Sequence, residues 1–527
     1  MPQLSQPTQK LISRYQQWHQ SLQPKEEIPT IHVDEVASKV AAFYEKIRGI
    51  IDWKEEHLLK RRAIERILKR RLFSQMDLTN GNFSPQILIA EPLVLELIRG
   101  GHFPNDKIEE SKIEEVQKSI DKYISVLNKA NLRPSRRTGK KSKIQLYSWL
   151  SAIAACEIEE ILSPSIKERA LIDYMFEQMK ERIKADIQEK NIQIYVAVQK
   201  ALFKLDAPVI SYHLLKHQYP NWTEQNIYQI KEKIEKQLNH PLGDKFYQIC
   251  EKHDTPFLLL GDVLSKNPVE AGKKLSNPEI LEIEIKEAYD KRVSTLKSRL
   301  GRAAFYSTLS IFLTNVVSLW LVEIPFNKFV TGYFFNFLAM GVDIFFPTLL
   351  MFVLVITIRP PKKENLSRVL MEIMKFVYEG KKKDIYEIKT FRKRGIILES
   401  IVKLFYLLGF LIIFGLIIWA LYQLNFPPLS YVIFIVFLSL IAFAGAKIRQ
   451  RAKELQVIEE KETFFHFLID PFAIPIIQLG KWLTIKWKKY NIIAVFFSAL
   501  IDMPFTIFVE FIEQWRYYLK EKKEKIH

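Results

Sequence analysis

Long runs of apolar residues dominate the second half of the chain and indicate its structural class. Four of them approach the roughly 20 apolar residues that an α-helix needs to cross the hydrocarbon core of a bilayer. They are Ala303–Val322, Tyr333–Ile358, Leu404–Leu424 and Ser430–Ala446. Helices buried in a soluble core would need far more covering polypeptide than this chain offers. The pattern therefore predicts an all-α, polytopic membrane protein.

The breaks between these runs predict two transmembrane hairpins. Pro427 and Pro428 cannot donate backbone hydrogen bonds and stop helix propagation, so residues 425–429 are expected to form a tight turn. The expected order is a first hairpin over 303–358, a basic insert over 359–403, a second hairpin over 404–446 and a tail over 447–527.

Residues 1–302 show a different pattern, in which apolar positions recur every three to four residues, as in the series that Val36 and Val40 begin. Few windows alternate apolar and polar residues as strands do, so we expect a large helical region rather than an α/β enzyme fold. After the capping pair Asn277-Pro278, a charged helix runs into the first apolar run with only Gly301 to weaken it. This predicts a stiff rod that enters the membrane.

The tail contains two similar segments, 464–489 and 496–523. The matching positions are Asp470, Pro471 and Trp482 in the first copy and Asp502, Pro504 and Trp515 in the second. Each aspartate and proline could cap a helix, which predicts two short helices with a bend in each copy. We favour amphipathic helices that lie in the membrane interface or re-enter it over a fifth and a sixth span. Chance similarity between two apolar segments is the remaining alternative.

The distribution of Lys and Arg along the chain predicts its orientation in the membrane. The net charge is +18, and segment 359–403 alone holds 13 Lys and Arg residues, whereas the turn 425–429 holds none. Because Lys and Arg concentrate in cytoplasmic loops, we expect the N-terminus, the insert and the tail to face the cytoplasm, with the spans in the cytoplasmic (inner) membrane. The first 30 residues lack the apolar core of a signal peptide, and the two cysteines cannot form a disulfide framework.

Basic clusters outside the apolar runs suggest contact with anionic lipid headgroups. The candidates are Lys60, Arg61, Arg62, Lys69, Arg70, Arg71, Arg136, Arg137, Lys140, Lys141, Lys486, Lys488 and Lys489. A solvated helix face and a basic loop are the simpler interpretation of those before residue 144. Nucleic acid is disfavoured, since no aromatic-basic RNA-binding motif accompanies the clusters.

One acidic residue, Asp343, interrupts the second apolar run. An acid inside a membrane span is costly, so it normally faces a partner or water and is functional by default. Asn336 lies on the same helix face, and Asn315 of the first run could meet Asp343 in the antiparallel hairpin. The simpler interpretation is packing through a hydrogen bond to Asn315. The alternative is a site for an ion or a proton.

No catalytic motif appears. The chain lacks the phosphate-binding and nucleophile-elbow glycine patterns, and HLLKH at 213–217 lacks the glutamate of a zinc-protease helix. We therefore expect no cofactor or metal, and the leading hypothesis is a non-enzymatic membrane scaffold that recruits a cytoplasmic protein. The alternatives are a transport or channel component that uses Asp343, which would need to be oligomeric, and a protein that binds or shapes lipid through its tail.

Overall fold

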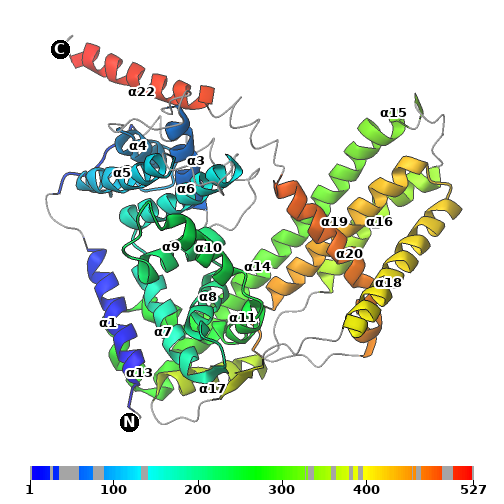
Figure 1. Cartoon of the computed structure of the whole chain (residues 1–527), viewed down its shortest axis with the longest axis horizontal. Helices are drawn as coiled ribbons and strands as arrows, with labels where there is room; N and C mark the ends of the chain where they lie inside the picture. Colours follow the sequence, from blue (N-terminus) through cyan, green and yellow to red (C-terminus); the bar gives the residue numbers. More distant parts are fainter. Residues whose placement is uncertain are drawn as a thin grey trace. The chain divides into compact units, whose positions relative to one another are not determined.

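The computed structural model describes most of the chain, and most of its helices are labelled in Figure 1. The described residues are 3–23, 28–34, 39, 59–74, 88–131, 140–326, 328–329, 337–357, 364–378, 384–389, 396–453, 455–457, 464–489 and 503–524. They are mostly helical, as the apolar periodicity predicts. They divide into two compact units: a bundle unit of residues 1–9 and 252–491, and an N-terminal unit of residues 10–251 and 492–527.

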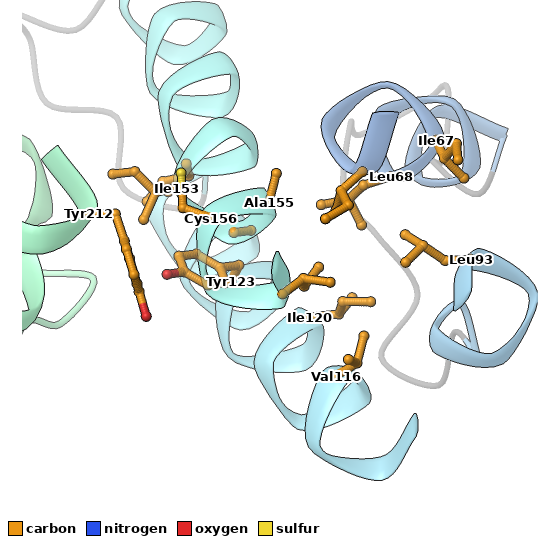
Figure 2. Close-up of a cluster of buried hydrophobic side chains, with 14 of the residues drawn as sticks. Ile67, Leu68, Leu93, Val116, Ile120, Tyr123, Ile153, Ala155, Cys156 and Tyr212 are labelled. Carbon is orange, nitrogen blue, oxygen red and sulfur yellow. The ribbon is translucent and has the colours of Figure 1, made fainter. Parts of the chain in front are cut away.

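The N-terminal unit is built from helices around a core of its own. Its elements are most of α1 (Gln6–Ser21), α3 (Leu59–Ser74), α4 (Ala90–Arg99), α5 (Ser111–Asn131), α6 (Lys140–Leu162), α7 (Ile166–Arg182), β1 (Ile183–Ala185), α8 (Lys190–Phe203), α9 (Ala207–Gln218), α10 (Ile227–Leu238), α11 (Gly243–Lys252) and α22 (Met503–Glu524). Figure 2 shows Leu68, Leu93 and Ile120 meeting from three different helices in that core. This burial stabilises the unit without help from the apolar runs.

The bundle unit contains the apolar runs. Its elements are α12 (Asp254–Lys266), α13 (Ala271–Ser276), α14 (Pro278–Ser318), the π-helical turn η2 (Leu319–Glu323), α15 (Ile324–Phe326), α16 (Phe337–Ile356), α17 (Glu364–Val377), β2 (Tyr386–Ile388), α18 (Ile396–Gln423), α19 (Pro428–Ala452) and α20 (Phe464–Lys489). Among the described residues, four helical stretches are long and apolar enough to cross a membrane, which suggests a membrane protein. They are 278–326, 339–356, 403–423 and 428–452.

Helix α14 confirms the predicted rod. It begins at Pro278, where the Asn277 side chain accepts a hydrogen bond from the Glu279 backbone N–H at 3.0 Å, and it continues through Gly301 to Ser318. At 1.5 Å per residue, its 41 residues extend about 60 Å. Residues 252–302 therefore belong structurally with the apolar runs, and the division between compact units falls at Lys252 rather than at Arg302.

The tight turn before α19 is also confirmed. Asn425 has a left-handed backbone with φ of 54°, Pro427 is the N-cap, and Pro428 is the first helical residue. Ser430 contacts Glu323, so this turn and the end of the first apolar helix lie at the same end of the bundle. Ala304 and Ile448 share a cluster near the opposite end, beside the basic residues that flank the helices.

The insert between the two hairpins packs against α12 and α14. Phe376 of α17 lies against Phe257 of α12, with ring centroids 4.5 Å apart. Asn365 is buried; its amide donates to the Tyr289 hydroxyl at 3.1 Å and accepts from the Val457 backbone N–H at 2.8 Å. One side chain thus joins the rod, the insert and the segment that follows α19.

Helix α20, the first copy of the tail similarity, corrects one prediction. Its backbone runs from Phe464 to Lys489 as one continuous helix, where two short helices were predicted. It crosses α19 obliquely (Figure 1). The two helices lie close together at Gly480, where an added Cβ would lie 2.0 Å from the Ser439 carbonyl oxygen. The lack of a side chain at Gly480 is what allows the two helices to approach so closely.

Substitution Gly480→Ala should separate α19 from α20. We expect the free energy of unfolding to fall by about 1–3 kcal/mol, since the methyl group overlaps backbone that cannot rotate away. Thermal unfolding of the purified protein in detergent measures this. Gly409→Ala in α18 is the control, because nothing lies within 4 Å of its added Cβ. Equal midpoints for the two variants would contradict the contact.

Candidate functional site

Two carboxyl groups meet inside the bundle, and they come from different helices. Asp343 lies in α16 and is 4% exposed, while Glu323 ends the π-helical turn η2 and is fully enclosed. Their side chains are hydrogen-bonded to each other. A hydrogen bond between two carboxyl groups requires a proton on one of them. This pair is the candidate functional site.

Helix spacing places Glu323 on the buried face of the first apolar helix. Asn315, Leu319 and Glu323 are spaced four residues apart, and all three are buried. The π-helical turn begins at Leu319 and ends at Glu323. Turns of this kind occur often at functional sites.

Two serine hydroxyl groups contact Glu323 of the pair. Ser430, at the start of α19 and fully buried, donates its hydroxyl to Glu323 Oε2. Ser318 Oγ, one turn back in α14, lies 3.5 Å from Glu323 Oε1. The site therefore joins three of the four long apolar stretches, and Glu323 is its centre. Polar contacts of this kind fix which helix faces meet in an apolar bundle.

Asn315 does not make the predicted hydrogen bond to Asp343. It is buried as expected, but Glu323 is the hydrogen-bond partner of Asp343. Both polar atoms of the Asn315 amide lack a hydrogen-bond partner within the described residues. The buried Ser439 hydroxyl of α19 is in the same state. Asn315 and Ser439 lie about 12 Å and 14 Å along their helices from Glu323 and Ser430, at 1.5 Å per residue. They mark polar positions deeper in the bundle.

Sequence reasoning missed Glu323. The first apolar run ends at Val322, and the charge of Glu323 directly after it gives no sign that the helix continues. Ser318 and Asn315 already gave that helix a polar face, and extending it by one turn would have included Glu323. Asn336, the third predicted polar residue, lies outside the described residues.

The basic cluster on α3 is used inside the N-terminal unit. Arg61 is 2% exposed and donates to Glu65 at 2.9 Å and to Asp206 at 2.5 Å. Arg71 donates to Glu96 at 2.8 Å, and Arg70 pairs with the same carboxylate. Lys69 pairs with Glu65, Arg62 lies 3.8 Å from Asp206, and Lys60 stands over the Phe103 ring. This corrects the lipid-headgroup prediction for Arg61, whose guanidinium is enclosed by protein.

The other predicted residues are distributed as follows. Lys486 of α20 stands over the exposed Trp482 ring, and Trp515 of α22 is exposed. Arg136, Arg137 and Asp502 lie outside the described residues, as do the side chains of Lys140, Lys141, Asp470, Pro471, Lys488, Lys489 and Pro504. Their predicted roles stay predictions.

His213 and His217 of α9 do not form a shared site. His213 is buried, and its Nδ1 lies 2.5 Å from Gln199 Oε1. Burial lowers the pKa of His213 to about 3, so the ring is neutral at physiological pH. His217, one turn later, is exposed. Across the described residues, no three His, Cys, Asp or Glu side chains are grouped to hold a metal.

Comparison with known proteins adds no family: no protein-family model, curated protein or solved structure matches this chain. Function is therefore argued from the carboxyl pair and from the surfaces of the two units.

Replacing the two kinds of buried polar group should have opposite effects on stability. Ser430→Ala removes the donor to a buried carboxyl oxygen and should lower the free energy of unfolding by about 1–3 kcal/mol. Asn315→Leu removes an amide without a partner, so stability should stay constant or increase. Thermal unfolding in detergent compares the two variants. A loss for Asn315→Leu as large as that for Ser430→Ala would contradict the description of Asn315.

Proposed function

We propose that the chain is a multi-pass protein of the cytoplasmic membrane, with its N-terminal unit on the cytoplasmic side. The outer faces of the four apolar stretches support this, because they expose Trp320, Phe345, Phe405, Trp419 and Val432. Soluble proteins rarely present so large an apolar surface to water. The grouping of basic residues at the end of the bundle away from Ser430 agrees with a cytoplasmic location for that end.

Within this membrane protein, the Glu323–Asp343 pair binds a proton or a monovalent cation. The observation that carries this proposal is the contact between two buried acids in an otherwise apolar bundle. Two adjacent carboxylates repel each other strongly where no water screens them, so one proton or one cation must neutralise part of their charge. A site of this kind can take up and release a positive charge as its surroundings change.

Transport follows if that charge can leave by either end of the bundle. Ser318 and Ser430 contact Glu323, and the buried groups of Asn315 and Ser439 offer further polar positions toward the basic end. Four spans rarely enclose a pathway alone, so we propose that the protein acts as an oligomer or as one component of a transport or channel assembly.

Asp343→Asn should abolish proton flux without preventing membrane insertion. The amide cannot release a proton, while its size preserves the packing of α16 against η2. Purified protein in liposomes with an internal pH-sensitive dye and an imposed potassium gradient gives the rate, which we expect to fall roughly tenfold or more. Glu323→Gln should behave alike.

The matched control is Asp290→Asn, which makes the same change at an exposed position of α14. Flux retained in Asp343→Asn would remove the pair from the mechanism. If the wild-type protein moves neither protons nor sodium or potassium ions in this assay, the transport proposal is abandoned.

A scaffold function is the second candidate, and the independent core of the N-terminal unit favours it. Residues 10–251 bury their own apolar cluster, so they form a stable helical surface that can bind a cytoplasmic protein. We expect a stoichiometric partner to co-purify with the full-length tagged protein from its native membrane, as measured by quantitative mass spectrometry. Lipid and no protein at stoichiometric level would rule this candidate out.

A further inference from the structure

Helix α22 exposes an aromatic stripe along one face. Phe511, Trp515 and Tyr518 follow one another at helical spacing, with ring centroids 6.4 Å and 6.0 Å apart, and they are 58%, 51% and 49% exposed. Ile507 and Phe508 extend the stripe at one end. Lys522 extends it at the other, with its ammonium group 5.5 Å from the centroid of the Tyr518 ring. We call these six residues the α22 stripe.

The opposite side of α22 is attached to its own unit. Arg516 lies on that side, at about 100° per residue, and forms an ion pair of 3.1 Å with Asp34. The stripe lies on the side of the helix that faces away from Asp34.

The first copy of the tail similarity shows how a related helix covers its apolar face. In α20, Gly480 packs on Ser439 of α19, and Gln478 accepts a hydrogen bond from Tyr406 of α18 at 2.5 Å. In α22, the rings of the stripe are exposed. The two copies therefore differ in their surroundings. Helix α20 packs against other helices, whereas α22 exposes its rings.

We propose that the α22 stripe lies in the headgroup region of a bilayer that contains anionic phospholipids. Trp and Tyr prefer this region because their rings are apolar and their N–H and O–H groups stay hydrated. Exposed Lys522 and Lys523 at the end of the helix provide charge that complements anionic headgroups. The proposal rests on membrane integration of the bundle but not on the carboxyl pair.

Chain length allows this placement. Helix α20 ends at Lys489 and α22 begins at Met503, so residues 490–502 connect them. At about 3.5 Å per residue these 13 residues reach at most about 45 Å, which keeps α22 close to the membrane that holds the bundle.

Two adjacent tyrosines provide a matched test. Tyr518 belongs to the stripe, whereas Tyr517 points about 100° away and is 54% exposed. Full-length Tyr518→Cys and Tyr517→Cys are labelled with an environment-sensitive fluorophore and reconstituted into nanodiscs with or without anionic phospholipid. The native Cys156 and Cys250 are buried and react slowly. Helicity and thermal midpoint establish that each variant is folded.

We expect the label at 518 to shift to the blue and to be quenched by brominated lipid when anionic phospholipid is present, while the label at 517 stays open to aqueous iodide. Iodide access at 518 equal to that at 517 would overturn the proposal. So would a label at 518 that is shielded from iodide yet unquenched by lipid, since another protein surface or a second copy would then cover it. Equal lipid quenching at both positions would also overturn the proposal, because the whole helix would then be immersed in the bilayer. Quenching that does not depend on lipid charge would overturn the requirement for anionic phospholipid.

Discussion

The partnership between Glu323 and Asp343 is the contact on which the arrangement of the bundle depends. A charged or polar group among apolar side chains gains stability only when it finds a partner within the protein, because no water is available there. Glu323 meets this requirement through Asp343 of α16 and Ser430 of α19. Apolar side chains alone leave the rotation of each helix free, whereas these hydrogen bonds select one face of each.

The same requirement explains why the basic residues of α3 do not all point to solvent. A buried guanidinium is stable only when carboxylates surround it, and Arg61 has Glu65 in its own helix and Asp206 at the start of α9. These ion pairs connect α3 to α4 and to α9 around the core of the N-terminal unit. A cluster that looks like a surface feature in the sequence is thus part of the packing.

The basic end of the bundle is held together by a buried polar side chain as well as by apolar packing. Asn365 joins α17 to the rod α14 and to the segment after α19, so it contacts parts of the chain on either side of both hairpins. The rod itself is continuous from Pro278 into the apolar region. A displacement of the basic end therefore reaches the helix that carries Glu323 without passing through a flexible joint.

The sequence by itself determined the features that depend on local chemistry. The length and apolarity of the four runs, the turn imposed by Pro427 and Pro428, and the capped start of α14 at Asn277 follow from neighbouring residues, and the structure contains each. Only the tertiary structure decided the partner of Asp343, the burial of Arg61 and the different surroundings of α20 and α22. These depend on which helix faces meet, and the residues that meet are distant in the chain.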